Sequence, residues 1–174
     1  SIRPDGSFDF HASKRIGNAQ WYAPGNAAAT CFTVRPSLVV QRTSNRDQKR
    51  ILNAAPVPNA FRDRFKRGFA AENHVIVLES LNKKTKVGTS VVAKLINSAV
   101  VNERFSAVSG SFSVSAKLLE RLALPDPRDV QAIPAEEFEH GLRVLFSGLE
   151  ILAPSKLARN SQNALDEPSD LARR

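Results

Sequence analysis

The chain is poor in the residues that carry most cross-linking and metal chemistry. Among its 174 residues there are one cysteine, three histidines and no methionine. A single cysteine cannot build an intrachain disulfide framework, and no cysteine cluster is present to hold zinc. His11, His74 and His140 have no partner at ligand spacing. We therefore expect neither a metal site nor a cofactor.

Long apolar runs and catalytic motifs are also missing. No run reaches the roughly 18 apolar residues that a membrane span needs, and residues 1–10 have no apolar signal core. The sequence has no phosphate-binding glycine loop and no dinucleotide fingerprint. Cys31 lies in an apolar stretch without a base beside it, and the acids of residues 136–139 fit a helix start better than a catalytic cluster. We predict that the protein is not an enzyme.

What the chain does have is positive charge, and that charge is uneven. The formal net charge is +8. Residues 1–70 carry 12 Lys or Arg against 4 Asp or Glu, whereas residues 117–174 carry 8 against 10. A basic excess of this kind favours a polyanionic partner.

The basic residues are densest in 59–69, which we predict to be an amphipathic helix. Phe61, Phe65 and Phe69 follow one another at i, i+4 and i+8, so they would share a buried stripe. The alternative is that these rings stack on bases while the neighbouring cations bind phosphates. Those cations are Arg62, Arg64, Lys66 and Arg67.

The middle of the chain predicts an antiparallel sheet. Residues 30–42 are β-branched and apolar, with Pro36 bending the strand or confining it to an edge, and 74–81 with 89–96 flank a polar turn as in a hairpin. Residues 108–116 alternate strictly, which places Ser109, Ser111, Ser113 and Ser115 on one face. Between the first strand and the basic segment, 44–55 predicts a short helix that Pro56 ends.

Helices are predicted to close the chain. Pro134 and the acids after it mark a helix start, an apolar stripe follows, and Pro154 ends the helix. A short helix is expected over 155–165. The fold class is thus α+β: an antiparallel sheet within 30–116, with an N-terminal hairpin, and helices within 134–165. Residues 1–29 are expected to form an irregular arm, 30–165 a single domain, and 166–174 a polar tail.

The order of these elements resembles the coat proteins of single-stranded RNA bacteriophages, the levivirus type. HVIVLESLNKKTKVGTSVVAKLIN matches the hairpin, and FSAVSGSFSVS matches the last sheet strand. AEEFEHGLRVLFSGLEILAPSKLARNSQNAL matches the two closing helices and the break between them. The resemblance covers roughly residues 73–165. Residues 117–132 are an insertion relative to that pattern, and the tyrosine expected on the RNA face is missing.

The resemblance implies a self-assembling capsid protein that packages single-stranded genomic RNA, and it leaves open a role as translational repressor through an RNA hairpin. It implies a homodimer whose two helices pack across the partner, then an icosahedral shell, found in the virion and in the host cytoplasm during assembly. The implied dimer contacts are Phe138, Leu142, Leu145, Phe146 and Leu149. The predicted RNA contacts are Lys83, Lys84, Lys86, Lys94, Arg104, Ser109, Ser111 and Ser113.

Other classes of protein stay open at this point. One is a nucleic-acid-binding protein or nucleoprotein that forms no closed shell, and another is a bacterial interaction or adaptor domain. Particle size separates a coat protein from a smaller binder, and the ultraviolet absorbance ratio of the purified material separates a nucleic-acid binder from an adaptor.

Overall fold

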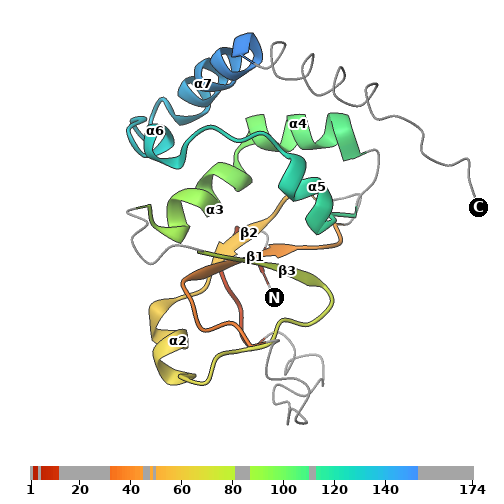
Figure 1. Cartoon of the computed structure of the whole chain (residues 1–174), viewed down its shortest axis with the longest axis vertical. Coiled ribbons are helices and arrows are strands. Elements are labelled where there is room, and N and C mark those ends of the chain that lie inside the picture. Colours follow the sequence, from red (N-terminus) through yellow and green to blue (C-terminus); the bar gives the residue numbers. More distant parts are fainter. Residues whose placement is uncertain are drawn as a thin grey trace, which may run out of the picture. The chain divides into compact units, whose positions relative to one another are not determined.

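A computed structural model of the chain describes residues 2–3, 5–11, 32–44, 48, 50–80, 87–109 and 113–152. The chain divides into two compact units, Ser1–Ala132 and Ile133–Arg174. Among the described residues, the first unit contains all of the strands and most of the helices, and the second contains one helix (Figure 1). Together the described elements form an α+β protein, as predicted.

The first unit is built on a three-stranded antiparallel sheet in the order β2-β1-β3. The strands are β1 (Ser37–Gln41), β2 (Ala54–Pro56) and β3 (Val75–Glu79). The central strand β1 pairs Val39 with Ala55 on one side and with Val77 on the other. Since β1 has a partner on both sides and layers on both faces, its first four residues are all buried.

One face of the sheet is covered by residues near the N-terminus and by α2 (Asn59–Arg64). Val39, Ala55 and Val57 form the buried centre of this layer, and Phe8 and Phe61 pack against it. The other face is covered by α3 (Thr89–Asn97), and α4 (Ala99–Ser109) packs against α3, so helices lie on both sides of the sheet (Figure 1). The sheet core therefore lies between two layers.

Two short helices complete the first unit, and each has a side-chain cap. Ser115 precedes α5 (Ala116–Arg121) and its hydroxyl accepts a hydrogen bond from the backbone N–H of Leu118 at 3.1 Å. Asp126 precedes α6 (Pro127–Gln131), with its carboxylate accepting the N–H of Arg128 at 2.8 Å. These caps satisfy N–H groups that a helix start leaves without a partner.

The described part of the second unit, 133–152, consists of α7 (Phe138–Leu152) and the turns that lead into it. Gly141 lets the helix approach the preceding segment, because a Cβ there would lie 2.7 Å from the Ile133 side chain. Helix α7 confirms the amphipathic helix expected after Pro134, although it begins four residues later. The predicted second helix at 155–165 and the tail at 166–174 lie outside the described residues.

The strands predicted over 30–42 and 74–81 are confirmed as β1 and β3, which occupy parts of those ranges. The expectation that Pro36 bends the first strand or confines it to an edge was wrong, because β1 is the central strand and begins directly after Pro36, which leaves the proline outside the sheet. The prediction of a strand over 89–96 was wrong, because these residues form α3. Short apolar runs fit either period, and here Ala93 and Ile96 are buried at the i, i+3 spacing of a helix.

The predictions for 108–116 and 44–55 were also wrong in their described parts. Helix α4 continues to Ser109, Ser113 makes only an isolated bridge to Thr43, and α5 begins at Ala116. Of the alternating serines, Ser113 thus makes a bridge and Ser115 caps a helix. No strand runs through the described positions of 108–116. In 44–55, the chain enters β2 at Ala54 rather than ending a helix there.

Candidate nucleic-acid interface

A turn after α2 gathers exposed positive charge at one end of β1. Helix α2 ends at Arg64, and the chain reverses at Gly68, whose φ of 90° is costly for a residue with a side chain. Phe69 then pairs with Thr33: the Thr33 N–H donates to the Phe69 carbonyl at 2.9 Å and the Phe69 N–H donates back at 3.1 Å. This bridge places the segment that carries Arg35 next to the turn that carries Lys66 and Arg67.

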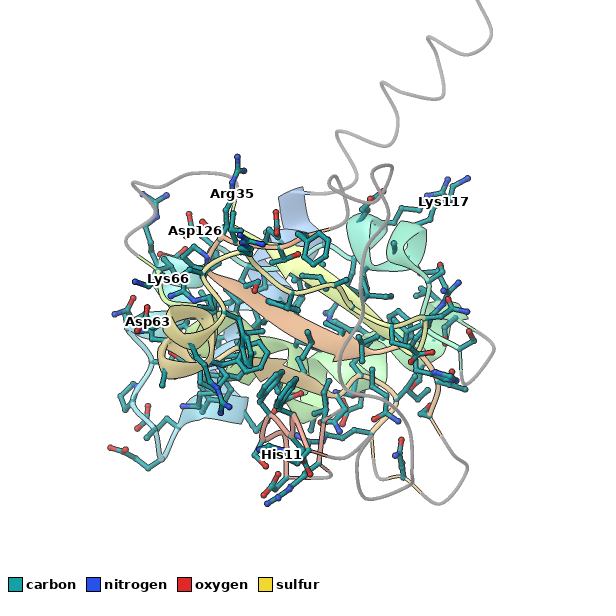
Figure 2. All side chains as sticks on the ribbon, turned by 90° about the horizontal axis from the view of Figure 1, so that it is seen from below. His11, Arg35, Asp63, Lys66, Lys117 and Asp126 are labelled. Atoms are coloured by element: carbon teal, nitrogen blue, oxygen red, sulfur yellow. The ribbon has the colours of Figure 1, made fainter. Side chains whose placement is uncertain are left out.

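We call Arg35, Lys66 and Arg67 the basic turn. The two segments that carry these cations approach closely at Gly68. A Cβ on Gly68 would lie 2.7 Å from the Thr33 carbonyl oxygen and 2.9 Å from the Val34 side chain. All three cations are exposed. In the view of Figure 2, Arg35 and Lys66 are labelled on the same side of the molecule as Asp63 and Asp126, whereas Lys117 is labelled on the other side. Among the residues that the structure describes, none of the three cations forms an ion pair.

Next to the basic turn lies a cluster of phenylalanines. Phe61 is at its centre, with ring centroids 5.1 Å from Phe8, 4.9 Å from Phe10, 4.7 Å from Phe65 and 5.6 Å from Phe69. Each of these rings is half-buried. Phe61 contacts both Phe65 and Phe69, as expected of rings that pack together. The predicted helix over 59–69 was wrong in extent, because α2 ends before Phe65 and the three rings do not form a stripe on one helix.

The opposite end of β1 brings three polar segments together. The Arg42 N–H donates to the His74 carbonyl at 2.8 Å, and the Val114 N–H donates to the Arg42 carbonyl at 2.7 Å. Thr43 bridges to Ser113. We call this surface the polar end. Its residues, all exposed, are Arg42, Thr43, Asn73, His74 and Ser113.

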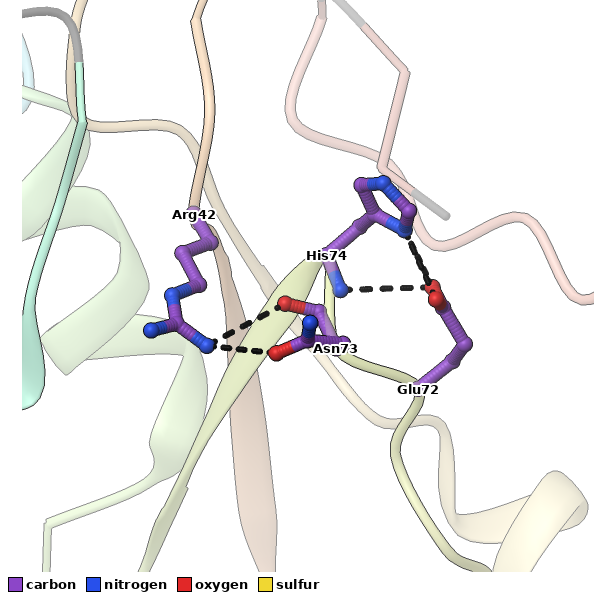
Figure 3. Close-up of polar contacts among 4 residues, drawn as sticks. All are labelled: Arg42, Glu72, Asn73 and His74. Atoms are coloured by element: carbon purple, nitrogen blue, oxygen red, sulfur yellow. Dashed lines mark hydrogen bonds and ion pairs between the residues drawn. The ribbon is translucent and has the colours of Figure 1, made fainter.

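Side-chain contacts hold the polar end in a defined geometry (Figure 3). Arg42 donates from Nη1 to Oδ1 of Asn73 at 2.6 Å. The Nδ1 atom of His74 lies 2.6 Å from Oε2 of Glu72, and the His74 N–H donates to the same carboxylate at 3.2 Å. The hydrogen bond from the His74 side chain is the main reason why the pKa of Glu72 is lowered from its ordinary value.

The residues predicted to bind RNA do not share the sheet face on which they were placed. Lys94 is exposed on α3 and Arg104 is half-buried on α4. Ser109 ends α4, whereas Ser113 belongs to the polar end. The premise of a common strand surface was therefore wrong, while RNA binding by these residues stays a prediction. The remaining predicted contacts lie outside the described residues: Lys83, Lys84, Lys86 and Ser111.

The residues predicted to form the dimer all lie on α7. Leu142 and Phe146 are fully buried and Phe138 nearly so, while Leu145 and Leu149 are half-buried. This pattern confirms the amphipathic character of the helix. The dimer itself stays a prediction.

The described residues contain no group of three or more His, Cys, Asp or Glu that could hold a metal ion. His74 is at the surface beside β3, and His11 and His140 are exposed as well. No helix among the described residues is long and apolar enough to cross a membrane.

Sequence reasoning found the basic residues after Phe61 but missed their partner Arg35, and it missed the polar end altogether. Arg42 and Asn73 are separated by 31 residues, and no local pattern links them. The one available signal was the position of Arg35 and Arg42 just outside the two ends of an apolar run, where a strand leaves its flanking residues in solvent.

No family model matches the chain, and neither a curated protein nor a solved structure matches it. The function is therefore inferred from the two surfaces described above.

Proposed function

We propose that this protein binds nucleic acid and that the basic turn contacts backbone phosphates. The observation that carries the proposal is the Thr33–Phe69 bridge, which brings Arg35 beside the turn that holds Lys66 and Arg67. The basic turn presents three exposed cations on two linked segments to a polyanion, and Asp63 is the acid nearest to Lys66 and Arg67 in sequence. The phosphates of a nucleic-acid strand carry the negative charge that such a site would bind.

The polar end supplies the second part of the proposal, contacts to bases. Arginine and asparagine are the side chains that pair most readily with purine edges through two hydrogen bonds. Arg42 is already oriented by Asn73, so little rotamer entropy remains to be lost when its other donors bind. The small hydroxyls of Thr43 and Ser113 leave room for a close approach. Phosphate contacts would then position the strand, and contacts at the polar end would discriminate among sequences.

The test is a salt series of binding measurements on labelled single-stranded RNA and duplex DNA by fluorescence anisotropy. For the double variant Lys66→Gln with Arg67→Gln, we expect weaker binding and a plot of log K against log salt that is shallower by about two, roughly one for each phosphate that is no longer neutralised. The matched control is Lys117→Gln, an exposed cation on α5 away from the basic turn. Equal effects of the double variant and the control would contradict the proposal, as would the absence of binding at low salt.

Assembly into an RNA-packaging shell stays a separate prediction. Two of the stretches that carry the resemblance to phage coat proteins, 89–96 and 108–116, are not strands in their described parts. Expression followed by nuclease treatment, sedimentation and electron microscopy tests the shell directly. Uniform round particles containing RNA would support assembly and a virion location, whereas a small species that still binds nucleic acid would leave the binding function alone.

A further inference from the structure

An open pocket lies between the N-terminal segment and α2, with a volume of about 440 Å³. This is within the range of small-molecule sites, which is roughly 300–1,000 Å³. Its walls combine aromatic rings with cationic side chains, and both segments belong to the first unit. The residues that define its chemistry are Arg3, Asp9, Phe10, Phe61, Arg64 and Phe65.

The apolar part of the pocket is formed by Phe10, Phe61 and Phe65. These rings support one another, with Phe10 4.9 Å from Phe61 and 5.4 Å from Phe65 between centroids. None of the three is fully buried. A flat aromatic ligand would gain stacking or edge contacts here without having to reorder the rings.

The charged part of the pocket has a fixed geometry. Arg64 lies over the Phe65 ring, with its guanidinium carbon 5.4 Å from the centroid. Arg3 is held by Asp9, from Nε to Oδ2 at 3.1 Å, and the Asp9 carboxylate also accepts the His11 N–H at 3.0 Å. Asp9 is buried and its charge is compensated by Arg3, so the exposed guanidinium groups determine the charge that a ligand meets. The pocket thus pairs an aromatic wall with cations at its rim.

We infer that this pocket holds one unstacked nucleotide, with the base against Phe10 and Phe65 and the phosphate near Arg64. The inference rests on the proposed function for its biological source, which would be a nucleotide displaced from the stack of a bound strand. Its chemistry is independent of that source, because a free nucleoside monophosphate carries the same ring and the same charge. Arg64, the last residue of α2, lies two residues before Lys66, so a strand on the basic turn passes close to the pocket.

The experiment uses adenosine 5′-monophosphate as the probe and records saturation transfer from the full chain to the adenine protons by NMR. We expect transfer at millimolar nucleotide, and a several-fold weaker affinity for adenosine, which lacks the phosphate that Arg64 would contact. Inorganic phosphate alone should displace little of the nucleotide. No transfer to adenine, or equal affinity for adenosine and its monophosphate, would overturn the inference.

Two variants locate the site. Phe10→Leu keeps an apolar side chain but removes the ring, and should abolish the transfer. Arg64→Gln changes an exposed side chain and should lower the affinity for the monophosphate to that for adenosine. Lys117→Gln is the charge-matched control and should change neither. If transfer persists in both pocket variants, the nucleotide binds elsewhere and the inference fails.

Strand binding measured on the same samples separates the two proposals. If the protein binds the monophosphate but has no affinity for RNA or DNA, the inference about the pocket stands and the proposed function is wrong. If the protein binds RNA or DNA but shows no saturation transfer to the free nucleotide, the proposed function stands and the inference about the pocket is wrong.

Discussion

Two regions of the first unit use polar side chains in opposite ways. Between β2 and helices α3 and α4, asparagine amides are turned inward and bonded to backbone. Asn97 accepts the Ala54 N–H at 2.7 Å and donates to the Ala54 carbonyl at 2.8 Å, so one side chain completes the edge of β2 as a neighbouring strand would. In the basic turn, by contrast, cations project into solvent. Inward polar groups determine the fold, and outward ones are available for binding.

Asn102 extends the inward network. Its Oδ1 accepts the Leu52 N–H at 2.8 Å, and its Nδ2 donates to the carbonyls of Ile96 at 3.1 Å and Ser98 at 3.0 Å. The amide thus joins the approach to β2 to the junction between α3 and α4. Because the site is buried, water cannot replace these bonds cheaply.

The largest expected effect follows from removing that amide. Asn102→Ala leaves the buried Leu52 N–H without its partner, and we expect a loss of about 2–4 kcal/mol in the free energy of unfolding. The midpoint of thermal unfolding, followed by circular dichroism, should fall by on the order of 10 °C. Asn73→Ala, at an exposed site, is the matched control and should cost less than about 0.5 kcal/mol. Similar thermal midpoints for Asn102→Ala and Asn73→Ala would contradict the view that inward polar groups stabilise the fold more than exposed ones do.

The next effect concerns the backbone on which the basic turn depends. Gly68→Ala puts a Cβ at positive φ and 2.7 Å from the Thr33 carbonyl oxygen, so we expect a loss of about 1–3 kcal/mol. Binding of nucleic acid should weaken as well, because the Thr33–Phe69 bridge next to the basic turn is disturbed. Gly148→Ala is the control, since nothing lies within 4 Å of its added Cβ and alanine favours a helix interior. A stable Gly68→Ala protein with full affinity would show that the bridge does not organise the turn.

A smaller effect is expected at the start of α5. Ser115→Ala removes the hydroxyl that accepts the Leu118 N–H, and removal of such a cap costs about 1 kcal/mol. Urea unfolding measures this cost. Ser106→Ala is a useful comparison, because the Ser106 hydroxyl only donates to the carbonyl of Asn102 in the turn before it and caps no helix end. Equal costs at the two positions would mean that the cap of α5 adds nothing specific.

The same contrast explains how far the sequence predicts the fold. Strands β1 and β3 and helix α7 were recognisable from local apolar patterns and from prolines and acids at their ends. Helices α3 and α4 were not, because a valine-rich run fits either period. Asn97 in α3 and Asn102 in α4 accept hydrogen bonds from backbone N–H groups that lie 43 and 50 residues away in the sequence. Such contacts favour the helical state, and no local pattern reveals them.

The candidate site follows the same rule. The cations of residues 62–67 stand together in the sequence and were found there. Arg35 joins them only through the Thr33–Phe69 bridge, and the polar end exists only because β1 and β3 pair in their observed register. A hydrogen-bonded register between distant segments is not encoded in a local pattern, so these parts of the surface could not be predicted.

The smallest expected effect is a pH dependence at the polar end. His74 holds the pKa of Glu72 below its ordinary value of 4.5, chiefly through its side-chain hydrogen bond. A carboxylate with a lowered folded-state pKa adds stability that is present above its unfolded pKa and is lost as the pH falls through the folded value. The window therefore lies below about pH 4.5. Both side chains are largely exposed, so solvent screening keeps the contribution small.

An NMR titration of the Glu72 side-chain carboxyl carbon measures this shift directly. The wild-type group should titrate below 4.5, and in His74→Ala its pKa should return toward that ordinary value. The thermal midpoint of His74→Ala should differ little from that of the wild type, in contrast to Asn102→Ala, because an exposed pair leaves no buried group unsatisfied when it is broken. A large drop in the midpoint would show that the polar end contributes to the fold as the buried asparagines do, and the division between inward and outward polar groups would not hold there.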